Sequence, residues 1–238
     1  MSTGCELAGR CGAVLESVIF DLDGVLIDSE RVWSSAREQL VRAHGGRWRE
    51  DATRAMMGMS SPEWSRYMHE RLGVQMAPEE IVQEVVGRLQ ALYRERLPLI
   101  PGAREAVVAL AERWRLGLAS SANRPIIDLV LELAHMRELF AVTVSAEEVA
   151  RGKPAPDVYL EAARRLASAP PRCAAVEDST NGLRAAAAAG MLVIALPNRD
   201  FPPTGEAVGL ADAIIGSLDE LRPALIERVA ASESRSPK

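Results

Sequence analysis

The sequence predicts an α/β fold in which a parallel β-sheet carries helices on both faces and a helical segment is inserted after the first strand. Three observations support this fold class. Short apolar runs rich in β-branched residues alternate with segments of helical periodicity. Residues 30–98 interrupt this alternation, because they are helix-rich and contain no convincing strand. A Pro/Gly-rich stretch at 97–102 then marks the return to the alternating pattern.

The first expected strand is 17–20, a β-branched and aromatic run that ends at Asp21. Later apolar runs predict strands at 116–119, 141–144, 174–176 and 192–195. Helical spacing predicts helices over roughly 103–113, 124–135, 156–167 and 180–189. The resulting organisation is an N-terminal arm (1–15), a core (16–29 and 99–230), a helical insertion (30–98) and a frayed tail (231–238).

Composition narrows the classes of protein that the chain can belong to. Its 238 residues are 48% hydrophobic, which supports a substantial buried core. A net charge of -5 argues against a nucleic-acid or anionic-membrane partner. The first fifteen residues lack the apolar segment of a signal peptide, and no apolar run approaches the roughly 18–20 residues that cross a bilayer. Cys5, Cys11 and Cys173 do not suggest a disulfide framework. We therefore expect a cytoplasmic protein; its oligomeric state is left open.

Two carboxylates, Asp21 and Asp23, follow the first expected strand and are separated by one residue. Ligands of an open parallel sheet bind beyond the carboxyl ends of the strands, so both acids are expected to face that crevice. Such a pair suits a metal site, or a nucleophile beside a general acid/base, and Gly24 allows a sharp turn next to it. A turn or helix cap with two solvated acids is the alternative interpretation of this short motif.

A second pair of acids, Glu177 and Asp178, follows the expected strand at 174–176 and precedes an alanine-rich helix. Taken alone, the pair is also consistent with simple helix capping. Together with the acids after the first strand, it predicts an oxygen-rich site of the kind that Mg²⁺ occupies.

Two further motifs supply groups that could hold a phosphate. Ser120 follows the expected strand at 116–119, where a hydroxyl and backbone N–H groups could bind phosphate oxygens or where the serine could cap the next helix. Lys153 lies in the proline-stiffened loop 152–156 and could neutralise both a phosphate and a nucleophile. Lysine is otherwise found only at Lys238 among 28 basic residues, which weakens the interpretation of Lys153 as a solvated surface group.

The chain resembles the haloacid dehalogenase superfamily in four motifs that occur in the family's order. These are Asp21-x-Asp23-Gly24-Val25-Leu26-x-Asp28-Ser29, then Ser120, then Gly152-Lys153-Pro154-x-Pro156, then Glu177-Asp178-Ser179. The chain is similar in particular to the branch that contains β-phosphoglucomutases and sugar-phosphate phosphatases, over roughly residues 16–215. The resemblance implies a Rossmann-like core and a mobile α-helical cap over residues 30–98.

The resemblance also implies a reaction, the Mg²⁺-dependent hydrolysis of small phosphate monoesters, such as sugar phosphates, through an aspartyl-phosphate. Asp21 would be the nucleophile, and Asp23 would be the general acid/base and would offer its backbone carbonyl to Mg²⁺. Ser120 and Lys153 would bind the transferring phosphoryl group. The metal site implied by the resemblance comprises Asp21, Asp23, Glu177 and Asp178.

Substrate selectivity in this architecture belongs to the cap and to its loop around Gly58, so the phosphorylated metabolite itself is not specified by the motifs. The candidate substrate-contacting residues are Ser29, Trp33, Gly58, Ser60, Ser61, Ser121 and Asn123.

The nearest alternative is a phosphomutase, which would use the same core residues. The resemblance implies that β-phosphoglucomutases have basic cap residues and a histidine where this chain has Met57, Ser61 and Trp33, although Arg54 or Arg66 could compensate. A phosphonatase would need a cap lysine, and residues 30–98 contain none. The resemblance implies that the dehalogenase branch lacks the second acid of the first motif, so the presence of Asp23 argues against it. An inactive regulatory protein would have lost one of the motif residues, and this chain retains them all. The hydrolase is therefore the preferred interpretation.

Overall fold

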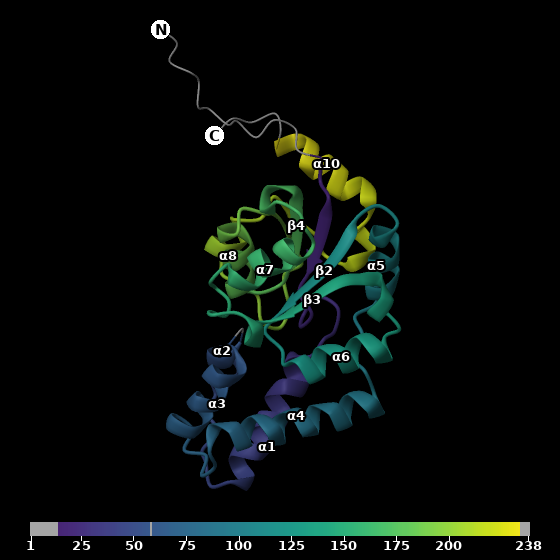
Figure 1. Ribbon diagram of the computed structural model, residues 1–238. Coiled ribbons are helices and arrows are strands. Elements are labelled where there is room, and N and C mark those ends of the chain that lie inside the picture. The colour runs from purple at the N-terminus through teal and green to yellow at the C-terminus, as the bar shows by residue number, and fades with distance from the viewer. Residues whose placement is uncertain (1–13, 58, 234–238) are drawn as a thin grey trace.

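The computed structural model describes residues 14–57 and 59–233. Within these residues, six parallel strands form one sheet in the order β3-β2-β1-β4-β5-β6, with helices on both sides (Figure 1). The strands are β1 (Ser17–Phe20), β2 (Arg115–Ser120), β3 (Phe140–Ser145), β4 (Cys173–Glu177), β5 (Leu192–Ala195) and β6 (Ala213–Ile214). The first strand of the chain therefore lies inside the sheet, between β2 and β4.

The strand order reverses between β1 and β4. Strands β2 and β3 lie in succession on one side of β1, and β4 pairs with the other side of β1. Loops that leave a parallel sheet on either side of such a point open a crevice beyond the carboxyl ends of the strands. Because Phe20 pairs with Val176, Asp21 and Glu177 reach this crevice at the same level.

Alternating side chains of the strands form two apolar layers. Val18 and Phe20 of β1 belong to one hydrophobic cluster, whereas Ile19 belongs to the cluster on the opposite face, as the two-residue period of a strand requires. One layer contains α7 (Asp157–Arg165), α8 (Thr180–Ala188) and α9 (Gly205–Val208), and the other contains α5 (Ala103–Ala111), α6 (Arg124–Leu133) and α10 (Pro223–Glu233). Short 3-10 turns lie at Arg137–Leu139, Ala146–Glu148, Pro170–Arg172 and Leu218–Glu220.

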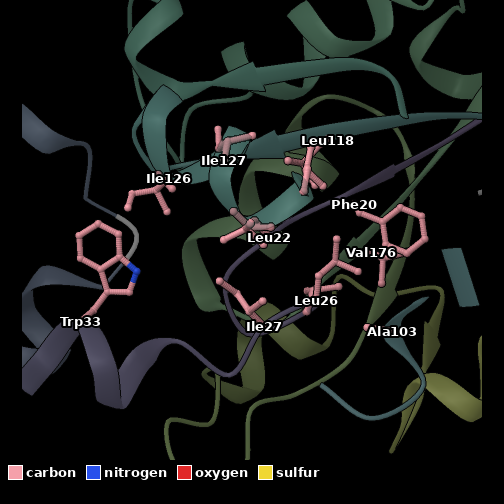
Figure 2. Packing of buried hydrophobic residues seen from close by; sticks show 14 of the residues in the cluster. Phe20, Leu22, Leu26, Ile27, Trp33, Ala103, Leu118, Ile126, Ile127 and Val176 are labelled. Atoms are coloured by element: carbon pink, nitrogen blue, oxygen red, sulfur yellow. The ribbon is translucent and has the colours of Figure 1, made fainter. Parts of the chain in front are cut away.

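The first four helices after β1 lie together at one end of the molecule (Figure 1). This helical group comprises α1 (Glu30–Ala43), α2 (Ala52–Met56), α3 (Ser61–Glu70) and α4 (Pro78–Glu95). Helices α1 and α3 pack against α4, which also contacts α6 of the sheet layer. In Figure 2, Leu22 and Ile126 lie between the sheet residue Phe20 and Trp33 of the helical group, and all four belong to one cluster. The apolar core is therefore continuous from the sheet into the helical group.

The two chain segments that connect the sheet with the helical group run side by side. Ile27 and Leu99 form an antiparallel bridge. The backbone N–H of Asp28 donates to the carbonyl of Pro98, and the N–H of Ile100 donates to the carbonyl of Leu26. The helical group is thus attached through one short paired clasp directly after the turn that carries Asp23.

The fold class expected from the sequence is confirmed, because the five expected strands and the alternating helices occur within a residue or two of the expected bounds. Strand β6 and helices α9 and α10 were not expected, and α10 extends to Glu233, three residues into the segment expected to be frayed. The expected arm at 1–13, with Cys5 and Cys11, the loop residue Gly58 and the tail at 234–238 lie outside the described residues. Among the described helices, none has the length and apolar character needed to span a bilayer.

The turn after β1 leads to a prediction about Gly24. Gly24 and Gly190 both have positive φ angles (79° and 74°), but a Cβ on Gly24 would lie 1.9 Å from the Asp178 Oδ2, whereas a Cβ on Gly190 would meet nothing within 4 Å. Gly190→Ala should therefore lower the free energy of unfolding by about 1–2 kcal/mol, the cost of the left-handed backbone alone. Gly24→Ala should lower it by about 1–3 kcal/mol more, because the new methyl group displaces a buried carboxylate. Urea unfolding of both variants measures the difference, and equal losses would contradict the assigned contact.

Candidate active site

A cavity lies between the carboxyl end of the sheet and the helical group, and it collects most of the predicted catalytic residues. Both the core loops and the helical group contribute to its wall. The described residues that line it are Asp21, Asp23, Glu30, Trp33, Arg37, Met56, Met57, Met59, Trp64, Ser121, Ala122, Lys153, Asp178 and Ser179. Glu177 and Ser120 are fully buried behind this wall.

Lys153 joins the acids of the two strand ends. Its Nζ donates to the Asp21 Oδ1 at 2.7 Å, to the Glu177 Oε1 at 2.6 Å and to the backbone carbonyl of Ala119 at 3.1 Å. Burial opposes the charge of the ammonium group, but the charges of the two carboxylates outweigh this effect and raise the pKa of Lys153 above its ordinary value. Lys153 is therefore a permanently charged group inside the protein, held by the two strands next to the reversal point.

Glu177 is anchored by the protein at both carboxylate oxygens. Its Oε1 accepts from Lys153 and from the hydroxyl of Tyr159, whose oxygen lies at 2.8 Å. Its Oε2 accepts from the backbone N–H groups of Asp178 and Ser179 and from the Ser179 hydroxyl. Gly182 leaves the space for this carboxylate, since a Cβ there would lie 1.8 Å from the Oε1. The arrangement fixes Glu177 as a support for Lys153.

Three buried carboxylates face one another beside this single cation. One oxygen each from Asp21, Glu177 and Asp178 lies within 4.8 Å of the others. Burial raises the pKa of Asp21 to about 8; Lys153 opposes the increase, and the charge of Glu177 adds to it. Burial, followed by the charges of Glu177 and Asp21, also raises the pKa of Asp178. Such an excess of hard oxygen donors and negative charge fits a divalent cation such as Mg²⁺.

Asp23 lies in the same cavity but has different partners. Its Oδ1 accepts hydrogen bonds from the Ser29 hydroxyl (2.5 Å) and from the indole N–H of Trp33 (3.0 Å). Burial raises the pKa of Asp23, and the two hydrogen bonds partly oppose the increase. Ser29 and Trp33, both predicted to contact substrate, thus hold the second acid of the motif, and Trp33 also forms part of the cavity wall.

After β2, the cavity wall contains Ser121, a predicted substrate contact, and Ala122, whereas Ser120 at the end of the strand is not part of it. The Ser120 hydroxyl is buried and accepts the backbone N–H of Ala122 at 3.0 Å. The phosphate-binding role of Ser120 stays a prediction.

Two asparagines connect core loops to the helical group. The Asn123 Nδ2 donates to the Ser61 hydroxyl (2.6 Å) and to the Glu147 carboxylate (2.7 Å). The Asn181 Nδ2 donates to the backbone carbonyl of Met57 at 3.5 Å. Asn123 and Ser61 therefore contact each other across the junction and lie outside the cavity wall.

Ser60 also lies outside this wall. Its hydroxyl and backbone N–H both donate to Glu63, an arrangement that caps the start of α3. Ser60 thus caps α3, and its predicted contact with substrate stays a prediction.

Sequence reasoning missed several residues of the cavity wall, chiefly Glu30, Arg37, Met56 and Trp64. Burial and the charge of Asp23 raise the pKa of Glu30 to about 7, and Arg37 opposes the increase. Arg37 lies four residues after Trp33, so the two share one face of α1; this spacing was the available signal.

Comparison with known proteins agrees with this geometry. Residues 15–190 match the family described as haloacid dehalogenase-like hydrolase. Hexitol phosphatase B of Escherichia coli (strain K12) is 36% identical over 211 residues, which cover 86% of this chain and 93% of that protein. The phosphorylated carbohydrates phosphatase of Thermotoga maritima is 32% identical over 179 residues, covering 74% and 82%.

A solved structure supports the same assignment. The crystal structure of CbbY from Rhodobacter sphaeroides in complex with phosphate superposes with a TM-score of 0.78 at 30% identity, covering 87% of this chain and 96% of that one. The named phosphatases confirm the expected enzyme class, a phosphoric monoester hydrolase. The family match over most of the chain and these relatives show that this protein belongs to the haloacid dehalogenase-like hydrolases.

Proposed function

We propose that this protein is a Mg²⁺-dependent phosphatase that hydrolyses small phosphate monoesters, sugar phosphates among them, through an aspartyl-phosphate on Asp21. One observation carries the proposal. A single cavity contains a carboxylate held by a buried cation (Asp21 with Lys153), a second carboxyl group held by neutral donors (Asp23) and an acidic group suited to a metal ion. These are the three components that phosphoryl transfer to a carboxylate requires.

In the first step, the free oxygen of the Asp21 carboxylate attacks phosphorus while Lys153 holds its Oδ1. The bond between phosphorus and the ester oxygen breaks, and Asp23 donates a proton to the departing alkoxide. The raised pKa of Asp23 suits this role, because the group retains a proton more readily than a solvated aspartate. Lys153 offsets negative charge on Asp21 and on the phosphoryl oxygens.

In the second step, water attacks the aspartyl-phosphate and Asp23, now ionised, accepts a proton from it. The bond between the Asp21 oxygen and phosphorus breaks, which releases inorganic phosphate and regenerates the carboxylate. The Ser29 and Trp33 hydrogen bonds hold Asp23 in one orientation for both proton transfers.

Asp21 and Asp178 would hold Mg²⁺ with their side chains, and Asp23 with its backbone carbonyl. Glu177 would act through Lys153, because both of its oxygens are already hydrogen-bonded. When bound, Mg²⁺ would offset the repulsion between the Asp21 carboxylate and the phosphate of the substrate.

The relatives support a small phosphorylated metabolite as substrate, because one is named for hexitol phosphates and another for phosphorylated carbohydrates. The phosphomutase alternative needs a firm hold on a second phosphate. Arg54 and Arg66, the two arginines considered for that role, are exposed and do not line the cavity. Where the mutase resemblance implies basic groups, Met57 lines the wall and Ser61 is bound to Asn123. We therefore propose hydrolysis as the net reaction.

Asp21→Asn should reduce turnover of a phosphate monoester on the order of 10³-fold or more, because the amide keeps the shape of the side chain and lacks the anionic nucleophile. Glu206→Gln, an exposed acid of α9 outside the four motifs, serves as the control and should retain wild-type turnover. Phosphate release with p-nitrophenyl phosphate and sugar 6-phosphates measures both variants. Turnover of Asp21→Asn within tenfold of wild type would refute the nucleophile assignment.

EDTA should abolish phosphate release, and added Mg²⁺ should restore it. Mg²⁺ should also raise the melting temperature of the wild-type protein, since a ligand that binds only the folded state stabilises it. Asp178→Asn should weaken this shift, whereas the exposed control Glu206→Gln should retain it. Full activity in EDTA, or an equal shift in Asp178→Asn, would show that the acidic group is not the metal site.

Incubation with β-glucose 1-phosphate, Mg²⁺ and a trace of the 1,6-bisphosphate separates the hydrolase from the mutase. We expect free phosphate to accumulate faster than glucose 6-phosphate. The opposite order would establish the mutase and would leave the roles of Asp21 and Asp23 intact.

A further inference from the structure

Arg37 is a buried charged group for which neither the fold nor the proposed reaction gives a reason. It lies on α1, is only 6% exposed and forms part of the cavity wall together with Asp21 and Asp23. Its Nε has no hydrogen-bond partner, and among the described residues no carboxylate lies within ion-pair distance of its guanidinium group. Burial lowers the pKa of Arg37 to about 10, so the group stays charged at neutral pH.

A buried arginine without a paired anion is unfavourable for folding, because its charge loses hydration and gains no ion pair in return. Several other arginines form ion pairs even at the surface: Arg42 binds Glu38, and Arg151 binds Asp157. Glu30 and Asp23 act on Arg37 only through longer-range attraction. Arg37 is therefore placed as a group that binds an anion from outside the chain would be.

Two tryptophans fix the orientation of the guanidinium group. Its central carbon lies 4.6 Å from the ring centre of Trp33 and 5.0 Å from that of Trp64, and the two indoles meet edge to face. Aromatic rings bind a guanidinium through its face, so the N–H donors along its edge remain for a ligand. Such an edge matches the two oxygens of a carboxylate or phosphate.

The two cations of the cavity come from different parts of the fold. Lys153 belongs to a core loop and holds the nucleophile, whereas Arg37 belongs to the helical group. A phosphate bound at Asp21 occupies the core side, so the remainder of the substrate extends toward the helical group. Arg37 is then placed to contact the leaving group of the reaction.

We propose that Arg37 binds a second anionic group, a carboxylate or a phosphate, on the leaving group of the substrate, and so selects phosphate monoesters that carry one. This inference rests on the proposed phosphatase function and deepens it by naming the substrate class. The opposing view is that Arg37 only joins two tryptophans within the helical group.

Matched pairs of substrates test the proposal. The pair 6-phosphogluconate and glucitol 6-phosphate differs in a carboxylate against a hydroxymethyl group, and the pair fructose 1,6-bisphosphate and fructose 6-phosphate tests a second phosphate. The measured quantity is the ratio of kcat/KM within each pair, which cancels losses of active protein. For one of the two pairs, we expect the wild-type kcat/KM to be at least about tenfold higher for the more anionic member. A preference within the first pair identifies a carboxylate as the bound group, and a preference within the second pair identifies a phosphate.

Arg37→Met, which retains the apolar stem, should lower that ratio by about 10–100-fold, the effect of losing a charged hydrogen bond. Arg37→Lys should recover part of the ratio, because it keeps the charge and loses the forked geometry. Arg42→Gln, on the exposed side of the same helix, should leave the ratio as in wild type. Melting temperatures show whether each variant is folded. If one Arg37 variant is not folded, the kcat/KM ratio of the other tests the proposal.

Binding measured by calorimetry in an Asp21→Asn background separates this proposal from the phosphatase assignment. Tighter binding of 6-phosphogluconate than of glucitol 6-phosphate, lost in Arg37→Met, would support the anion site even if wild type released no phosphate. Ratios near one in wild type for both pairs, or ratios in Arg37→Met equal to those of wild type, would overturn the proposal.

Discussion

One buried ammonium group determines the arrangement of the catalytic end of this protein. The Nζ of Lys153 lies between Asp21 and Glu177, which end the two strands on either side of the reversal point. Without a cation between them, these carboxylates would repel each other strongly in an interior from which water is excluded. Because hydrogen bonds from Tyr159 of α7 and from the backbone after β4 fix Glu177, the position of Lys153 is fixed as well, and with it the orientation of Asp21. Glycines at 24 and 182 provide the space that this packing requires.

Much of this arrangement could be predicted from the sequence, because the strands are compact apolar runs and their carboxyl ends must meet. Asp21 and Asp178 could therefore be placed at one site before any contact was known. Strand β6 escaped prediction because it has two residues, and Ile214 in it is exposed, so it carries no clear hydrophobic pattern. Helix α10 begins at Pro223 and has an apolar face too weakly periodic to separate from an irregular tail.

The partners of individual side chains could not be predicted, since they depend on how separate elements cross. Trp64 meets Trp33 only because α3 packs on α4 beside α1. The hydrogen bond from Asn123 to Ser61 crosses the junction between two elements far apart in the sequence. Spacing along one helix places Arg37 on the same face as Trp33, but it does not reveal whether that face meets solvent or a cavity.

The paired clasp of Ile27 and Leu99 has a consequence for how such proteins diversify. The helical group enters and leaves the sheet at one place, immediately after the strand that ends before Asp21. Substitutions in its helices, or a change in their number, therefore alter the wall of the cavity while the acids at the strand ends keep their places. Trp33 is the exception, because its indole holds Asp23; elsewhere the helical group can change the shape of the cavity without moving these acids.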